Sequence, residues 1–123
     1  MAIGDFAWCF GNQVLNYIVE RKKADDLASS ILDGRYKEQK FRLKNSGIDN
    51  IFYLFEGHPS TTCPKTKKEL DNALLKTSVQ DGFKVVRTNA PNESVKFLAE
   101  VHRLIMEKIK YNTEEVETVG TIE

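Results

Sequence analysis

Residues 14–32 read VLNYIVERKKADDLASSIL, and this segment predicts a strand that leads straight into a helix. Its first half, Val14 to Lys22, is rich in the β-branched and aromatic residues that favour strands. Asp25 and Asp26 follow, and acidic side chains suit the first turn of a helix. The helix should present an apolar stripe to the core and end at Asp33-Gly34.

A second strand is expected immediately upstream, from Asp5 to Phe10. The turn signal Gly11-Asn12-Gln13 separates the two strands, so they should form a hairpin. A two-residue loop at Asn12-Gln13 would place Asp5 directly opposite Glu20 on the neighbouring strand. The Cβ atoms of such a pair lie about 4.5–5.5 Å apart.

The rest of the chain alternates between helices and strands. Helices are expected at Arg35–Lys44, Lys67–Thr77 and Asn92–Tyr111, and strands at Ile51–Phe55 and Phe83–Arg87. The continuous apolar run Ile51–Phe55 is typical of a strand buried on both faces. This alternation predicts an α/β fold, with helices on the faces of a sheet.

Length and composition limit the possible classes of protein. The chain has 123 residues and a net charge of zero, which fits one small domain. No segment approaches the roughly 18 consecutive apolar residues of a membrane span, so we expect no membrane partner. His102 lies on the apolar stripe of the last predicted helix, where we expect it to pack in the core. Residues 112–123 carry four glutamates and no base, and we expect a disordered acidic tail there.

Asp5, Glu20 and Lys22 should share one face of the hairpin, because Glu20 and Lys22 are two positions apart on a strand. Two adjacent carboxylates repel each other unless a proton or a cation lies between them. Mg²⁺ prefers such oxygen ligands and can activate a water molecule for attack on a phosphate. The alternative is a surface hairpin with an ordinary acid–lysine pair. The spacing alone leaves both interpretations open.

Between residues 35 and 44, five basic side chains stand against the single acid Glu38. A run of this kind is usually the solvated face of a helix. It can also bind phosphates, because a polyanion responds to local rather than net charge. Composition alone favours the solvated face.

The elements Gly4-Asp5, Glu20-Arg21-Lys22 and Asp26 follow the pattern G-D-x(n)-E-R-K-x-x-x-D. This pattern resembles the nuclease signature of the XPF-type structure-specific DNA endonucleases. The likeness continues through Asp33-Gly34-Arg35-Tyr36-Lys37-Glu38-Gln39-Lys40-Phe41-Arg42-Leu43, and within the family it is strongest to the catalytic subunits that act at crossover junctions. It implies a restriction-endonuclease-like core over residues 1–111, a mixed sheet flanked by helices. The family's first strand-helix-strand segment and its helix-hairpin-helix domain would be missing.

The resemblance also implies roles for individual residues. Asp5 and Glu20 would bind a divalent metal, Mg²⁺ or Mn²⁺, and the backbone carbonyl of Arg21 would complete the protein ligands. Lys22 would be the catalytic lysine of the core. Asp26 would be a further required acid.

On the next helix, the resemblance implies contacts to the scissile strand and nearby phosphates from Arg35, Gln39, Lys40 and Arg42. The implied function is a metal-dependent endonuclease that cleaves branched DNA, such as flaps, forks and nicked Holliday junctions, in repair and recombination in the nucleus. The implied partner is a non-catalytic subunit of the same family, in a heterodimer. The alternative is a truncated, non-catalytic module that binds DNA or the partner subunit.

Overall fold

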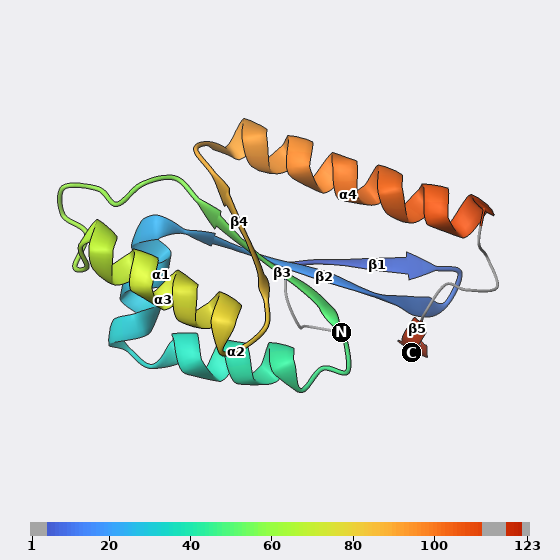
Figure 1. The fold of residues 1–123 in the computed structure, drawn as a ribbon, viewed down its shortest axis with the longest axis horizontal. Helices are drawn as coiled ribbons and strands as arrows, with labels where there is room; N and C mark the ends of the chain where they lie inside the picture. Colours follow the sequence, from blue (N-terminus) through green and yellow to red (C-terminus); the bar gives the residue numbers. More distant parts are fainter. Residues whose placement is uncertain (1–4, 112–117, 122–123) are drawn as a thin grey trace.

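The computed structural model describes residues 5–111 and 118–121 (Figure 1). The chain runs through β1 (Phe6–Phe10), β2 (Gln13–Lys23), α1 (Ala24–Leu32), α2 (Arg35–Lys44), β3 (Asn50–Glu56), α3 (Lys67–Val79), β4 (Lys84–Thr88), α4 (Pro91–Tyr111) and β5 (Thr118–Thr121). The predicted order of helices and strands is therefore confirmed. Among the described residues, no helix combines the length and the apolar character that a membrane crossing requires.

The strands form one mixed sheet in the order β1-β2-β3-β4. β1 is antiparallel to β2, whereas β3 and β4 run parallel to it through the connections that carry the helices. The predicted α/β fold with a mixed sheet is thus confirmed. Ile51, Tyr53 and Phe55 pack against the helices on one side, and Leu54 is also fully buried, so β3 is covered on both faces as expected.

β5 corrects part of the prediction for the tail. Residues 112–117 and 122–123 lie outside the described residues, but Thr118–Thr121 form a strand that pairs antiparallel with Gln13–Leu15 of β2. The physical reason is the length of β2. Its pairing with β3 begins only at Tyr17, so the first residues of β2 would otherwise leave their backbone groups unpaired on that edge.

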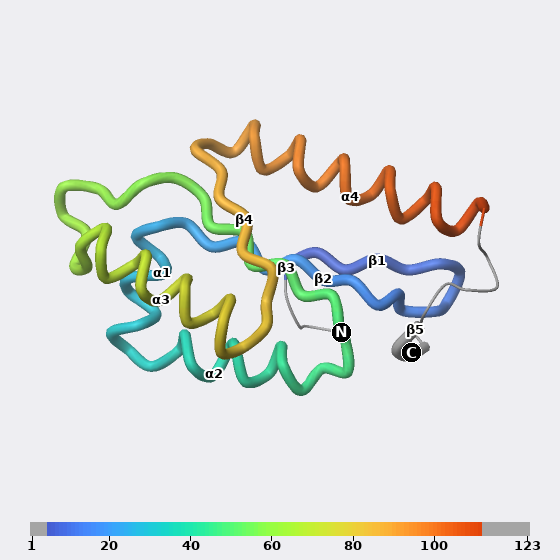
Figure 2. The backbone as a smooth tube through the Cα atoms, in the orientation of Figure 1, coloured from blue at the N-terminus to red at the C-terminus, as the bar shows by residue number. Residues whose placement is uncertain are grey.

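The helices cover the two faces of the sheet unequally (Figure 1). α1, α2 and α3 share one face with a large apolar cluster that includes Ile18, Leu27 and Leu74. α4 lies alone on the other side and runs back along the β1–β2 hairpin, as the chain trace shows (Figure 2). There Leu15 packs with Val101, Ile105 and Ile109 of α4.

The expectation for His102 is wrong, because its side chain is exposed. The buried apolar residues of α4 repeat every four residues at Val101, Ile105 and Ile109. Phe97 and Met106 are only partly buried beside this strip, and His102 lies outside it and faces solvent.

A partly buried ion pair joins the two layers. The guanidinium of Arg21 donates hydrogen bonds of 3.0 and 2.7 Å to the carboxylate oxygens of Glu56, whose side chain is 3% exposed. Ser94, near the start of α4, donates a further hydrogen bond of 2.6 Å to Glu56, and its Oγ lies 2.7 Å from Thr88 Oγ1. The hydrogen bond from Arg21, reinforced by Ser94, holds the pKa of Glu56 below its ordinary value. The network therefore ties β2, β3, β4 and α4 together.

We predict that Glu56→Ala lowers the free energy of unfolding by about 2–4 kcal/mol at pH 7, because it leaves Arg21 and Ser94 without their acceptor. Since the pKa of Glu56 is lowered on folding, this stabilisation is present above its ordinary value of 4.5 and is lost as the pH falls. Urea unfolding at pH 7 and pH 3 measures both effects. Glu107→Ala, which removes an exposed partner of Arg103, should change stability by less than about 1 kcal/mol. Equal losses in the two variants at pH 7 would contradict the prediction.

Candidate active site

The hairpin brings the first two predicted ligands together. Phe6 pairs with Val19 and Ala7 with Ile18, and just before β1 the backbone N–H of Asp5 also donates to the carbonyl of Val19, at 3.2 Å. The Asp5 carboxylate accepts a hydrogen bond of 2.8 Å from the backbone N–H of Arg21. Asp5 therefore lies close to Glu20, close enough for its charge to raise the pKa of Glu20, although the strand pairing itself ends at Phe6 and Val19.

The turn that produces this pairing differs from the expected one. The loop is Gly11-Asn12, because Phe10 pairs with Gln13. Gly11 has φ 62°, the left-handed conformation that opens such tight hairpin turns. The register then shifts at an irregularity in the ladder. Cys9 pairs with Val14 and Ala7 with Ile18, so two residues along β1 correspond to four residues along β2. This shift restores the alignment of Asp5 with Glu20.

Glu20 and Lys22 point to the face of the sheet that carries α2. Lys22 is buried and donates a hydrogen bond of 3.1 Å to Gln39 Oε1 on that helix. Burial raises the pKa of Glu20 to about 7, with a further rise from the charge of Asp5, while Lys22 and Arg42 act in the opposite direction. The site thus holds a carboxylate that is poorly solvated and repelled by its neighbour. A proton or a cation would relieve this repulsion.

The structure places Arg21 and Asp26 differently from Glu20. The side chain of Arg21 reaches Glu56 on the opposite face, as alternation along β2 requires, so only its backbone borders the carboxylate pair. Asp26 is exposed on the first turn of α1. Within the described part of the chain, no group of three or more His, Cys, Asp or Glu side chains is arranged to hold a metal. The roles of the Arg21 carbonyl and of Asp26 remain predictions.

The four predicted DNA-binding residues of α2 do not form a single patch. Gln39 contacts Lys22, and Arg42 lies close enough to Glu20 to lower its pKa. Arg35 is exposed at the start of the helix, where its Nε lies 2.7 Å from Asp33 Oδ2. Lys40 points away toward α3 and forms an ion pair of 2.8 Å with Asp81.

Sequence reasoning missed Tyr53, which lies in register with Glu20 on the adjacent strand β3. Its ring packs edge-to-face on Tyr36, its side chain is 1% exposed, and its hydroxyl has no hydrogen-bond partner among the described residues. Burial raises the pKa of this phenol above its ordinary value. A buried polar group without a partner is rare and costly, which makes Tyr53 a candidate for contact with a bound ion's water shell. Within the apolar run Ile51–Phe55, nothing in the sequence distinguishes it.

These donors fit a hard divalent cation. Two adjacent carboxylates and a backbone carbonyl offer oxygen ligands, and waters can complete the shell of Mg²⁺. The pKa of Glu20 is raised by burial and by the charge of Asp5, and the positive charges of Lys22 and Arg42 offset this only in part. Lys22 supplies one positive charge at the edge of the pair, and its ammonium is held in place by Gln39.

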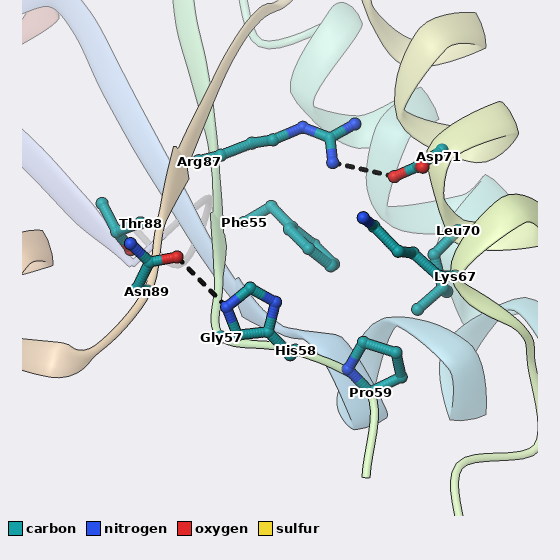
Figure 3. A pocket seen from close by; sticks show the side chains of 10 residues that line it. All are labelled: Phe55, Gly57, His58, Pro59, Lys67, Leu70, Asp71, Arg87, Thr88 and Asn89. Carbon is teal, nitrogen blue, oxygen red and sulfur yellow. Dashed lines mark hydrogen bonds and ion pairs between the residues drawn. The ribbon is translucent and has the colours of Figure 1, made fainter.

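A separate cavity of about 130 Å³ lies where β3 and β4 end (Figure 3). Four of its polar side chains are paired with each other: Arg87 binds Asp71 at 2.8 Å, and His58 Nε2 lies 3.1 Å from Asn89 Oδ1. Neither Asp5 nor any charged residue of β2 lines it. This cavity is therefore not part of the carboxylate site.

We predict that Glu20→Gln stabilises the metal-free chain at pH 8 by about 1–2 kcal/mol, an amount reduced by solvent screening. The pKa of Glu20 is raised from 4.5 to about 7 on folding, so the wild-type chain loses stability as the pH rises through this window. Urea unfolding in EDTA at pH 4 and pH 8 should show no gain at the lower pH. Glu107→Gln, an exposed change on α4 away from the site, should show no gain at either pH. A gain in stability of equal size at pH 4 would show that the gain does not come from the raised pKa of Glu20.

Comparisons with known proteins agree with this geometry. Residues 1–101 match the family described as the ERCC4 domain. The "Probable crossover junction endonuclease mus81" of Dictyostelium discoideum is 37% identical over 91% of this chain and 14% of its own length. The "Structure-specific endonuclease subunit MUS81" of Homo sapiens is 44% identical over 79% of this chain and 20% of its own length. The chain therefore spans a small part of these curated relatives.

The fold is also found among solved structures. "XPF from Aeropyrum pernix, complex with DNA" superposes with a TM-score of 0.66 at 27% identity, covering 75% of this chain and 46% of that one. The DNA-free structure of XPF from the same organism gives the same TM-score and covers 80% of this chain and 50% of that one. The predicted resemblance and the α/β nuclease fold are both confirmed. The chain belongs to the ERCC4 domain family, with the XPF-type nuclease fold and the sequence features of the MUS81 endonucleases.

Proposed function

We propose that this chain provides the catalytic centre of a Mg²⁺-dependent endonuclease that cleaves branched DNA. The observation that supports the proposal best is the juxtaposition of Asp5 and Glu20 on the face that also carries Lys22. Family membership and the names of the relatives, crossover junction endonuclease and structure-specific endonuclease subunit, point to the same chemistry.

In this proposal, Asp5, Glu20 and the carbonyl of Arg21 hold the ion, with Mn²⁺ as a possible substitute. Bound there, Mg²⁺ would supply an activated water and offset the charge that develops on the phosphate. The Asp5 carboxylate is held in place by the N–H of Arg21, and Lys22 by Gln39, so both groups are oriented before substrate arrives. Arg42, on the same flank of α2, offers a guanidinium to the phosphates beside the scissile bond.

The proposed substrates are flaps, forks and nicked Holliday junctions, and the proposed setting is repair and recombination in the nucleus. The word "subunit" in the name of the human relative and the DNA complex of the archaeal relative favour an assembly that works on DNA. We propose a heterodimer with a non-catalytic member of the same family.

A second candidate is a non-catalytic module that binds DNA or the partner subunit. The observation that favours it is the small number of converging acids, since no cluster of three ligating side chains occurs in the described residues. The two candidates differ in whether DNA is cleaved when metal and partner are both present.

We predict that millimolar Mg²⁺ raises the melting temperature of this chain, because the ion binds the folded hairpin and not the unfolded chain. At 100 times the dissociation constant, the gain amounts to about 2.7 kcal/mol. Asp5→Asn should abolish the rise, whereas Asp71→Asn, a change of equal charge at the Arg87 ion pair, should preserve it. Differential scanning calorimetry with Mg²⁺ and with EDTA makes the comparison. An Asp5→Asn variant that responds like the wild type would refute the site.

We predict cleavage of a labelled 3′-flap in Mg²⁺ when the chain is co-expressed with the partner subunit. Lys22→Ala should reduce the rate by about 10²–10³-fold, the usual loss when one charge-stabilising donor is removed from an active site. Lys68→Ala, an exposed change on α3, serves as the matched control. Flap binding without any cleavage, with the partner present, would favour the non-catalytic module instead.

A further inference from the structure

The basic residues of α2 lie on two flanks of the helix rather than on one face. Tyr36 and Leu43 are buried and define the side that packs on the protein. At 3.6 residues per turn, Arg35, Gln39 and Arg42 fall on one side of this buried strip, and Lys37, Lys40 and Lys44 fall on the other. The first flank meets the carboxylate pair, as the contact between Gln39 and Lys22 shows.

The second flank borders a groove of about 530 Å³ between α2 and α3. Both helices lie on the same side of the sheet (Figure 1). The charged side chains that line the groove are four lysines and one glutamate, namely Lys37, Lys40, Lys65, Lys76 and Glu69. Asp5, Glu20 and Lys22 do not line it, so it is separate from the proposed catalytic centre.

Two of the four lysines already have acidic partners. Lys40 is paired with Asp81 at 2.8 Å, and Lys65 with Glu69 at 3.3 Å. Lys37 and Lys76 are exposed, and neither makes an ion pair or a hydrogen bond within the described part of the chain. They leave two uncompensated positive charges on opposite walls of one groove. Such charges attract the phosphates of a nucleic-acid backbone, since binding releases condensed counterions.

The outer ridge of α2, between the two flanks, carries Phe41, which is 67% exposed, and the acid Glu38, whose carboxylate lies 3.8 Å from the guanidinium of Arg42. An aromatic ring cannot bind phosphate, but it can stack on bases that have lost a neighbour. Bases of this kind occur where the arms of a branched DNA separate. The helix therefore offers phosphate-binding groups on both sides of a ring suited to a branch point.

We propose that the α2–α3 groove binds backbone phosphates of a second DNA segment, so that α2 lies between two arms of a branched substrate. The inference rests on the proposed function, in which the other DNA arm enters the site of Asp5 and Glu20. A linear duplex can engage one flank of α2 at a time, whereas a branch engages both. The groove would therefore supply preference for branched over linear DNA, a property distinct from cleavage.

The test is binding of fluorescent DNA, measured by anisotropy. EDTA removes the metal, so binding is measured in the absence of cleavage. The probes are a fork with single-stranded arms, a blunt duplex of equal length and a single strand. Lys37→Ala with Lys76→Ala is compared with Lys96→Ala with Lys110→Ala, which removes the same charge from exposed positions on α4. Thermal unfolding of both variants checks that they remain folded.

We expect the groove variant to lose the preference for fork over duplex and to lower the salt slope for the fork by about 1.4, which is 0.7 for each lost contact to a single strand. Duplex binding and the α4 control should stay unchanged. Competition by the single strand or by the duplex identifies which kind of arm occupies the groove. Equal losses on fork and duplex, or the same loss in the α4 control, would overturn the proposal. Because the measurement is DNA binding in EDTA, failure of metal binding or of cleavage leaves this result intact.

Discussion

The alternation of side chains along β2 is the constraint on which the rest of the structure depends. Three consecutive residues, Glu20, Arg21 and Lys22, go to opposite faces of one strand. Glu20 and Lys22 face α2 and meet Asp5 and Gln39, while Arg21 passes to the other face and binds Glu56. One short segment therefore builds the candidate site and anchors the layer of α4 behind it. A shift of one residue in the register would exchange these roles and destroy both.

The candidate site and its support have opposite electrostatic characters. At the site, Glu20 is placed where burial and Asp5 make its charge unfavourable, which disfavours the metal-free fold and favours a bound cation. Behind it, Glu56 is fully compensated by Arg21 and Ser94, and its charge favours the fold. The stability lost at a functional site is commonly offset by such well-satisfied networks elsewhere. Tyr53, next to Glu20 on the adjacent strand β3, is a further buried group at the site whose hydroxyl has no hydrogen-bond partner among the described residues.

The position of α2 relates the chemistry to the shape of the proposed substrate. The helix follows α1 closely and packs through Tyr36 and Leu43, and this leaves Arg35 on one flank and Lys37 on the other exposed to solvent. The Tyr36 hydroxyl bonds to the carbonyl of Ala73 and to Thr77 on α3, which holds the two helices on either side of the lysine-lined groove. Recognition of DNA by such surfaces depends on where phosphates lie rather than on base sequence. A fold with basic groups on two diverging flanks is thus suited to reading the shape of DNA.

Local features of the sequence determined the elements and the fold class. Strand-forming residues in β2, acidic residues at the start of α1 and the apolar run in β3 each act within a few positions. The turn signal likewise predicted the hairpin, but its final register depends on the irregularity between Ala7 and Cys9. The tertiary structure decided what depends on contacts between distant segments. Packing of α3 turned Lys40 toward Asp81, the buried strip of α4 left His102 in solvent, and the free edge of β2 received β5. Periodicity shows which residues share a side of a helix, but only the neighbouring elements determine how far around the helix burial extends.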